Sequence, residues 1–429
     1  MTPYQYLILQ YCLLIVFALC IVSLIVAKIH SPFWFHQPIQ HTYELYPKYF
    51  ARVPYVKRKK PPTRGIFCIP DRVYTWDIHH TTIQEYQSYI MSLIQGHYVD
   101  NETHIYSVSY EMWTKTILKD PFCMISLYVG TRRMEPTYVL MPDIRMVYGM
   151  MTSRPVGLYF RKYPEHNCEI HYWDHICIKQ GLKHPENYTR SLIQTHMYNH
   201  HHKYLSSYRN EGLVYLFKKE IDLCKGVVPL TQTNVYTFVL KKTPIHKLPI
   251  YYRLRILNKT HQEVWRAIYV EMTRQFEICA LPSMVATIDW LSNERYYVFA
   301  TIYKEPHQTE HIHGVYIFEH THISWIQEGF EKRPYMLRLV GSMCFGGSPM
   351  IDPQRIYFFR GFLHSLKQVL YDHKHFGILE IPNISHNHWI LDKWCEKYSL
   401  KNETNMAYYL YNMIYPRSPI KASNVMVLV

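Results

Sequence analysis

Glycine is scarce in this sequence, and its cysteines are not closely paired. Only 15 of the 429 residues are glycine, which excludes collagen-like and glycine-rich classes of protein. None of the ten cysteines forms a C-x-x-C pair, so neither a zinc ribbon nor a dense disulfide scaffold is expected. We interpret the cysteines as buried, reduced thiols. Charged residues are also few, at 19%, and apolar residues make up 48%, which excludes an intrinsically disordered chain.

Metal-binding spacing is absent too, although the chain has 27 histidines. His196 and His200 lie four residues apart on a predicted helix, but no glutamate completes an H-E-x-x-H arrangement. In a chain so rich in histidine, other close pairs arise by chance. We therefore predict no metal site.

The chain carries a large excess of positive charge, with a formal net charge of +14 at pH 7. Such an excess suits nucleic acid, an anionic membrane surface or a phosphate-rich cofactor, and the sign alone does not choose among them. The sequence holds no recognised nucleic-acid-binding motif, so we predict that nucleic acid is not a partner.

A long uncharged run lies near the start of the chain. Residues 6–27 contain no charged side chain, and these 22 residues match the roughly 20 that a helix needs to cross a bilayer. The alternative is a cleaved signal peptide, which has a basic start and a shorter apolar stretch. No Lys or Arg precedes residue 6, so we predict a transmembrane helix over residues 6–27. Lys28, Lys48 and the basic run 57–60 follow it, and a single-pass protein with its domains facing the cytoplasm is therefore expected.

Beyond residue 65 the chain reads as two similar units. Thr82–Glu85 and Thr260–Glu263 both have the T-x-x-E pattern of a capping box, which begins a helix. Strand-like runs follow each box, and this repeated order predicts two α+β domains, over residues 66–245 and 246–429. The stretch before them, residues 28–65, is expected to be a linker or arm.

Several elements of these domains can be placed from the residue pattern. The run 185–198 predicts a helix, and the runs 296–303 and 315–320 predict a hairpin joined by a polar, histidine-rich loop. The strands predicted in the first domain are 138–141, 145–151, 156–160 and 169–178.

Five short motifs follow one another along the chain. They are F-W-F-H-Q-P-I at Phe33–Ile39, I-P-D-R-V-Y-T-W at Ile69–Trp76, Y-V-D-N-E at Tyr98–Glu102, D-H-I-C-I at Asp174–Ile178 and Y-Y-L-Y-N at Tyr408–Asn412. In this order, and above all in the last motif, the sequence resembles the N-myristoyltransferase family. That family has F-W-x-T-Q-P-V, L-P-x-G-F-x-W, Y-V-E-D, N-F-L-C-V and Y-Y-L-Y-N in the same sequence.

The resemblance covers the chain from about residue 33 to its end. It implies tandem acyl-CoA N-acyltransferase (GNAT-like) domains of the α+β class, with the acyl-CoA site in residues 66–245 and the peptide site in residues 246–429. It also implies that the arm 28–65 binds CoA. The implied reaction transfers a myristoyl group from myristoyl-CoA to the N-terminal glycine of a peptide or protein, in a monomer and without a metal. The membrane helix is a departure, because the family's enzymes are soluble.

The expected CoA site lies where the strand ending at Ile178 passes through a basic turn into a helix. Free backbone N–H groups at a helix N-terminus, with basic side chains beside them, suit the phosphates of CoA. An ordinary basic turn is the alternative. The resemblance adds Phe33 and Trp34, whose alternative role is an aromatic belt at the membrane surface. The turn and helix residues that we expect to bind the cofactor are Lys179, Lys183, His184, Pro185, Glu186 and Asn187.

The resemblance also implies the catalytic groups. The backbone N–H groups of His175 and Ile176 would polarise the thioester carbonyl, as fixed donors that do not titrate. The C-terminal carboxylate, here that of Val429, would accept the proton of the attacking amine. A frayed tail is the alternative, but the apolar run 427–429 favours a tail folded inward. Cys177 is adjacent, but an amine nucleophile needs no acyl-enzyme, so we interpret Cys177 as an inert thiol.

The peptide side departs most from the family. Tyr98, Asp100 and Glu102 keep an acidic loop, and Glu403 and Tyr408 keep part of the segment near the end. The glycines of the family's G-x-G-D-G are absent from residues 400–404, and its R-Y-x-H-R segment has no match. An inactive relative that serves as a membrane-bound binder or structural protein is therefore the first alternative. A transferase for another acyl-CoA or for a lysine amine is the second.

Overall fold

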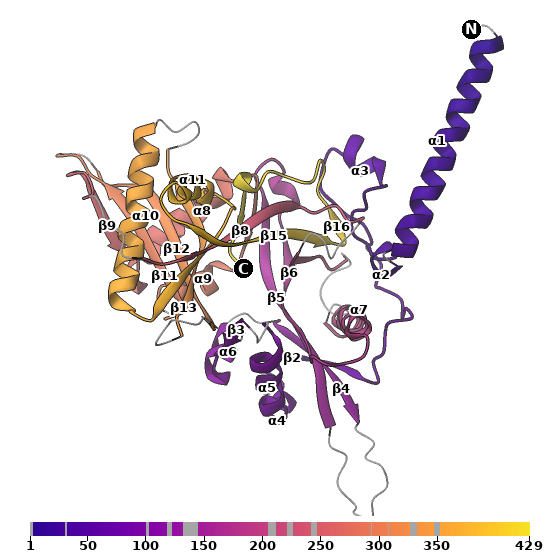
Figure 1. Cartoon of the computed structure of the whole chain (residues 1–429), viewed down its shortest axis with the longest axis horizontal. Helices are drawn as coiled ribbons and strands as arrows, with labels where there is room; N and C mark the ends of the chain where they lie inside the picture. Colours follow the sequence, from indigo (N-terminus) through magenta and orange to yellow (C-terminus); the bar gives the residue numbers. More distant parts are fainter. Residues whose placement is uncertain are drawn as a thin grey trace, which may run out of the picture.

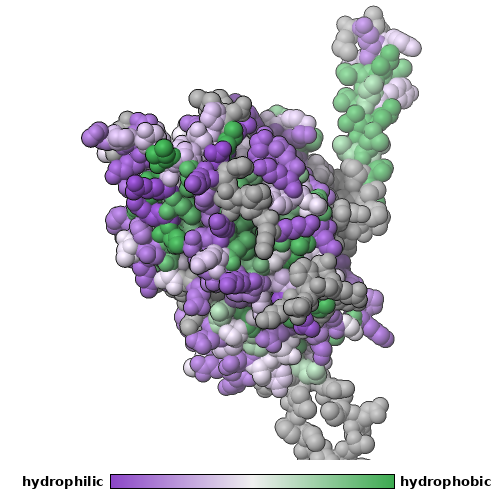
Figure 2. Space-filling view, turned by 60° about the vertical axis from the view of Figure 1, so that its left-hand side comes forward, coloured by the Kyte–Doolittle hydropathy of each residue, from purple (hydrophilic) through white to green (hydrophobic). Residues whose placement is uncertain are grey.

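An apolar helix stands apart from the rest of the molecule (Figures 1 and 2). It is α1 (Pro3–His30), and its segment Tyr4–Val22 has the length and composition of a membrane span, with none of it buried against the body. The predicted apolar helix is therefore present, and both a membrane anchor and a signal sequence fit it. The structure, a computed structural model, describes residues 3–30, 32–99, 103–117, 122–131, 145–204, 212–220, 226–241, 247–292, 294–307, 309–326, 333–346 and 352–429.

The body is built on one large twisted sheet in which the same strand order occurs twice. In each half, four antiparallel strands are followed by a helix that crosses to a fifth, parallel strand. A parallel pair needs such a crossover, because its strands start at the same edge. The first half is formed by β2 (Val73–Asp77), β4 (Met124–Thr131), β5 (Arg145–Phe160), β6 (Cys168–Ile178), α7 (Pro185–Tyr204) and β7 (Tyr215–Glu220). The second is formed by β9 (Tyr252–Ile256), β11 (Tyr296–Tyr303), β12 (His311–Trp325), β13 (Tyr335–Cys344), α10 (Asp352–Asp372) and β14 (Phe376–Pro382).

The two halves are joined by an exchange of strands. β8 (Thr231–Val239) follows the first half in the chain but pairs with β14. β15 (Leu400–Tyr411) follows the second half but pairs with β7, and β8 and β15 pair with each other at the centre of the sheet. This is the α+β, GNAT-like architecture that the sequence predicts, while the domain boundaries themselves stay a prediction.

Helices cover both faces of each half (Figure 1). In the first half, α5 (Gln87–His97) and α7 pack on opposite faces, each over its own hydrophobic cluster. In the second half, α8 (Gln262–Gln275) covers one face and α10 the other. The smaller helices are α2 (Pro32–Phe35), α3 (Leu45–Tyr49), α4 (Thr82–Glu85), α6 (Tyr110–Ile117), α9 (Met284–Trp290) and α11 (Asn387–Cys395). The remaining strands are β1 (Tyr55–Val56), β3 (His104–Tyr106), β10 (Ile278–Leu281), β16 (Met413–Ile414) and β17 (Val425–Val427).

Most predicted elements are confirmed. The hairpin forms from β11 and β12 with the expected antiparallel register, and the helix predicted over 185–198 is α7. The runs 145–151 and 156–160 are parts of one long strand, β5, because it pairs first with β4 and then with β10 along the same edge. The run 138–141 lies outside the described residues.

Both predicted capping boxes are wrong in detail. The N-cap of α4 is Thr81, and it makes no side-chain cap. Before α8, Asn258 takes the capping position two residues earlier than expected, and a short 3₁₀ turn precedes the helix. The Asn258 side chain accepts the Thr260 N–H at 3.0 Å, because asparagine competes well for exposed backbone donors.

Candidate active site

The centre of the first half is a fork between two strands. β6 and β7 pair in parallel only at His171–Tyr215 and Tyr172–Leu216. Beyond these pairs both strands continue without pairing to each other. The fork therefore opens towards Ile178 and the turn that follows it, and offers unpaired strand edges to an extended ligand.

A bulge lies in β6 at this fork. Met151 pairs with Ile176 and Ser153 with Trp173, so the single residue Thr152 stands opposite two residues of β6. The His175 N–H donates to Thr152 Oγ1 at 3.1 Å, and the same oxygen lies 3.3 Å from His175 Nδ1. One of the two backbone donors implied by the resemblance thus already has an acceptor.

The His175 side chain is buried and neutral. Its ring lies 5.0 Å from that of Tyr98 and 6.2 Å from that of Trp113, centroid to centroid. Burial lowers the pKa of His175 despite the nearby Asp174 carboxylate. Cys177 is buried beside it, and burial raises the pKa of its thiol to about 12, in agreement with an inert thiol.

Ion pairs join neighbouring strands within each half. Arg154 of β5 donates to Asp174 of β6 at 3.0 Å. Arg338 of β13 lies between Glu319 of β12 (Nη1–Oε2 3.3 Å) and Glu380 of β14. Arg295 also pairs with Glu319. Burial alone would raise the pKa of Asp174 and Glu319, but the adjacent guanidinium groups lower both, so the carboxylates stay charged.

Sequence reasoning missed these ion pairs because their members belong to no motif. The available signal was a single charged residue inside an otherwise apolar strand, as in V-Y-I-F-E-H around Glu319 and Y-M-L-R-L-V around Arg338. Such a residue is costly to bury alone and implies a partner. Its partner lies on another strand, which the sequence alone does not identify.

The last residues of the chain lie inside the molecule (Figure 1). β17 pairs in parallel with β10, and the Leu428 N–H donates to the Ala280 carbonyl at 3.0 Å. Leu428 is fully buried and Val429 half-buried. A Cβ on Gly341 of β13 would come within 3.0 Å of the Leu428 side chain, so this glycine permits the close packing. The frayed-tail alternative is therefore wrong.

The basic turn after β6 is exposed at the open end of the fork. Gly181 and His184 adopt positive φ angles, of 80° and 57°, and turn the chain into α7. The side chains of Lys179 and Lys183 lie on this turn, with Pro185, Glu186 and Asn187 in the first turn of α7. The Glu186 carboxylate lies 3.5 Å from His184 Nδ1, and Asn187 Oδ1 accepts from Arg190 at 3.3 Å.

The two aromatic residues of the arm have different environments. Phe33 is buried, with its ring 5.6 Å from that of Phe67, so it is part of the core and the aromatic-belt alternative is wrong for it. Trp34 stacks on Phe217 of β7 at 5.5 Å, and Phe217 stacks on Trp173 of β6 at 4.7 Å. Trp34 therefore lies at the fork.

The residues predicted for the peptide side are not all brought together. Tyr98 contacts His175, and Tyr408 packs with Tyr172 in the same cluster. Glu403 is exposed, accepts from Asn234 at 2.7 Å and lies five residues from Tyr408 along β15, about 16 Å away. Asp100 and Glu102 lie outside the described residues.

Lys218 is a further residue that the sequence did not single out. It follows Phe217 in β7 and pairs across the ladder with Tyr408, and its Nζ lies 5.9 Å from the Tyr408 ring. Burial, helped by Arg338, lowers the pKa of Lys218 to about 8. This amine therefore loses its proton more readily than an ordinary lysine.

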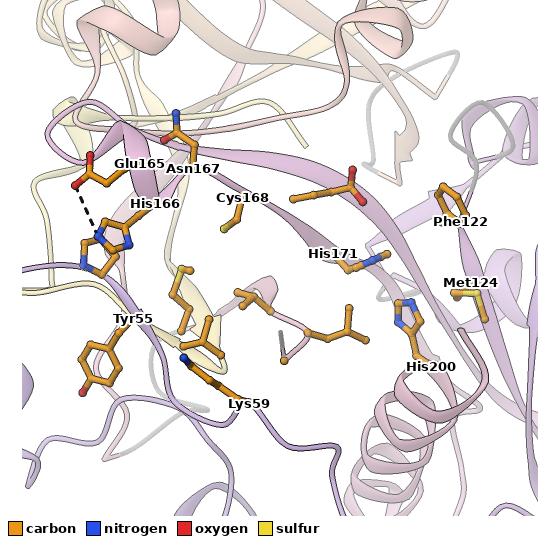
Figure 3. Close-up of a pocket in the computed structure, with 17 residues that line it drawn as sticks. Tyr55, Lys59, Phe122, Met124, Glu165, His166, Asn167, Cys168, His171 and His200 are labelled. Atoms are coloured by element: carbon orange, nitrogen blue, oxygen red, sulfur yellow. Dashed lines mark ion pairs between the residues drawn. The ribbon is translucent and has the colours of Figure 1, made fainter. Parts of the chain in front are cut away.

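A cavity of about 670 Å³ lies at the closed end of the fork (Figure 3). It has the size of a small-molecule site. Tyr55 and Lys59 of the arm line one side, and His171 of β6 and His200 of α7 line the other, with their rings 4.4 Å apart. Its apolar lining is Pro54, Val56, Phe122, Met124, Leu213, Val214 and Met413. Within the described residues, no group of three His, Cys, Asp or Glu is placed to hold a metal ion.

Known structures match this fold. No protein-family model matches the chain, and no curated protein matches its sequence. A structure of Saccharomyces cerevisiae N-myristoyltransferase with bound myristoyl-CoA matches with a TM-score of 0.65 and 12% identity, over 93% of this chain and 94% of that one. A second, with myristoyl-CoA and inhibitors, matches with a TM-score of 0.64 and 13% identity, over 96% and 99%. The chain therefore has an N-myristoyltransferase-like fold.

Proposed function

We propose that this chain is a membrane-anchored acyltransferase that transfers a myristoyl group from myristoyl-CoA to the N-terminal glycine of a protein. The observation that carries the proposal is the C-terminal segment 425–429, which is held by β10 and packs in one hydrophobic cluster with Tyr172 and Tyr408. Leu428 is fully buried and Val429 half-buried, which is unusual because chain ends are commonly frayed. The N-myristoyltransferase-like fold, found with bound myristoyl-CoA in the yeast enzyme, supports the choice of donor.

In this proposal the acyl-CoA lies along the fork. Its phosphates bind at the open end, where Lys179, Lys183 and His184 precede the N-terminus of α7 with Pro185, Glu186 and Asn187. Trp34 contacts the CoA at the fork, and the buried Phe33 holds the arm in place. The acyl chain points to the closed end, where the 670 Å³ cavity takes its distal part.

The thioester carbonyl would lie at the bulge of β6. Ile176 offers its N–H to the oxygen, and the Thr152 hydroxyl, which already accepts the His175 N–H, offers its proton. The substrate ammonium gives a proton to the Val429 carboxylate, and its nitrogen then attacks the thioester carbon. The new C–N bond forms as the C–S bond breaks, and CoA leaves as the thiol. Tyr98 and Tyr408 flank this centre on the peptide side, while Glu403 lies farther out along β15. Asp100 and Glu102 are proposed from the sequence to receive a basic residue of the peptide.

A second candidate is an inactive, CoA-binding relative. The observation that favours it is the engaged His175 N–H, which removes one of the two donors implied by the resemblance.

The test is turnover of the full chain in detergent with myristoyl-CoA and peptides that begin with glycine or alanine. We expect thiol release with the glycine peptide alone. Deleting Leu428 and Val429 should lower kcat by about 10²–10⁴-fold, the contribution of a general base, whereas Val429→Ala keeps the carboxylate and activity. CoA binding without turnover would instead support the inactive relative. Mass spectrometry of the bound acyl-CoA separates myristoyl from shorter donors.

A further inference from the structure

An apolar and basic surface projects from the arm around α3. Its large side chains are far more exposed than a soluble surface requires, with Tyr49 at 64% and Phe50 at 67%. Lys48 and Arg52, both exposed, lie among them. We call this surface the α3 patch, and it consists of Leu45, Tyr46, Lys48, Tyr49, Phe50, Arg52 and Val53.

The α3 patch is held firmly in this exposed position. Glu44 forms an ion pair with Lys57, and the Lys57 ammonium also donates to the Ile39 carbonyl at 2.7 Å. Pro47 is buried beneath the helix, and the Phe50 N–H donates to the Tyr46 carbonyl at 2.9 Å. The outward display of apolar groups is therefore part of the fold, and does not result from a frayed loop.

The α3 patch lies on the side of the body from which α1 rises (Figure 1). In that view α3 projects from the same side of the body as α1 and at the height of the middle of that helix, whereas α10 lies at the far end of the body. The chain needs only residues 31–44 to pass from the end of α1 to the start of α3. A bilayer crossed by Tyr4–Val22 would therefore have its surface close to α3.

We propose that the α3 patch is a second membrane contact, which inserts its aromatic and apolar side chains into the headgroup region of an anionic bilayer. Tyr and Phe suit this region because their rings are apolar and, for Tyr, the hydroxyl stays wet. Lys48 and Arg52 can extend to the phosphates, and Arg58, Lys59 and Lys60 add nearby positive charge. The proposal rests on α1 as a membrane span, which is part of the proposed function, and does not depend on acyl transfer.

Two contacts fix an orientation that one helix cannot. With α1 alone, the body is free to rotate about the helix axis. With the α3 patch also in the bilayer, the connecting segment with α2 and Trp34 is held at the membrane surface. The open end of the fork then keeps a constant position relative to the lipid in which an acylated product would insert.

The test is lipid photo-cross-linking of the full chain in nanodiscs of phosphatidylcholine with about 20% phosphatidylserine. The photoreactive residue p-benzoylphenylalanine replaces Tyr49 in the α3 patch, Leu14 in α1 or Tyr371 in α10. Tyr371 is the matched control, since it is an exposed tyrosine, at 74%, on the far side of the body. All three side chains are exposed, so the substitutions leave the fold intact.

We expect lipid adducts at positions 14 and 49 and severalfold fewer at position 371. Changing Lys48 and Arg52 to Gln should lower the yield at position 49 severalfold, because each basic residue adds to binding of the anionic surface. Equal yields at positions 49 and 371 would overturn the proposal, as would cross-links from position 49 to a second copy of the chain. Absence of lipid adducts at position 14 would overturn both the span and the proposal. Thiol release in detergent is measured separately, so loss of acyl transfer leaves this result readable.

Discussion

The two halves share one strand order but differ at their parallel strand pairs. In the first half, β6 and β7 pair at two positions and then separate, with a cavity at one end and a basic turn at the other. In the second half, β13 and β14 pair over four positions, from Tyr335–Phe376 to Arg338–Glu380. The Arg338–Glu380 ion pair joins the strands at the last of these pairs. The fork of the first half, which we call the open fork, is therefore suited to a ligand. The fork of the second half, which we call the closed fork, is tied together by the Arg338–Glu380 ion pair. We call the two halves open and closed accordingly.

The crossover helices differ in the same way. α10 packs an apolar face on the sheet, formed by Phe358, Phe362 and Leu366 among others. α7 buries polar side chains in addition to its apolar Leu192, Ile193 and Met197. His196 lies between Ser126 (2.8 Å) and Ser153 (2.9 Å), and His200 bonds the Tyr215 hydroxyl at 3.1 Å. The crossover helix of the first half therefore covers a buried polar layer as well as an apolar one.

The largest expected effect on stability comes from removing the ion pair that joins β13 and β14 in the closed half. Arg338→Met would leave Glu380 without its guanidinium partner and Glu319 with Arg295 alone. We expect the free energy of unfolding to fall by about 3–5 kcal/mol, the usual cost of removing one member of a buried ion pair. The matched control is Arg255→Met, which removes an exposed pair with Glu310 and should leave the free energy of unfolding nearly unchanged. Urea denaturation measures both, and equal losses would contradict the contrast.

Acid should distinguish the two crossover helices. Burial lowers the pKa of His171 to about 4 and that of His196 to about 3, against 6.5 when exposed. The folded state therefore binds fewer protons than the unfolded state below pH 6.5. The stabilisation is complete above pH 6.5 and is lost as the pH falls from there towards 4.

At pH 5 we expect each of these two histidines to lower the free energy of unfolding by about 2 kcal/mol at most, relative to pH 7. The protection factors of the backbone amides, which correct for the intrinsic pH dependence of exchange, should consequently fall in α7 more than in α10 between pH 7 and pH 5. His196→Gln, which keeps both hydrogen-bonding roles without titrating, should reduce this difference between α7 and α10. An equal loss of amide protection in both helices would show that the buried histidines beneath α7 do not determine how acid destabilises this helix.

The sequence predicts the elements of this fold better than their arrangement. Alternating residues identify β11 and β12, and the apolar run 427–429 predicts an inward tail. The fork depends on the register between β6 and β7, which are separated in the chain by α7, so no local pattern reports it. The Asn258 cap shows the local limit, since a stronger capping residue displaced the expected box by competition for the same donors.

The candidate site shows the same difference between what the sequence predicts and what only the folded structure reveals. Phe33 could be named from a motif, but its burial against Phe67 depends on how the arm returns to the body. The contact between Thr152 and His175 depends on a bulge that places one residue opposite two. Motifs therefore identify candidate residues, while strand pairing decides which of their groups stay free to react.

A smaller effect, on kcat, should come from the Thr152 hydroxyl beside the open fork. Thr152→Val removes the hydroxyl that accepts the His175 N–H, with little change in shape. If this hydroxyl supports the thioester oxygen, kcat should fall by about tenfold or more while the KM for acyl-CoA stays the same. The control is Thr301→Val, a buried threonine of β11 in the closed half, whose hydroxyl donates to the Gly314 carbonyl. A rise in KM at constant kcat would assign Thr152 to ground-state binding.

The smallest expected effect tests whether only the open half binds the cofactor. Lys183 lies on the exposed turn at the open end of the fork, and Lys367 is an exposed lysine of α10 in the closed half. Lys183→Gln should raise the Kd for myristoyl-CoA about two- to fivefold, because a single exposed charge contributes about 0.2–1 kcal/mol. The effect should fade at high salt, as screening weakens exposed charges. Lys367→Gln should leave the Kd unchanged in a calorimetric titration. Equal effects of both substitutions would show that the overall positive charge attracts CoA, and that the turn after β6 is not its specific site.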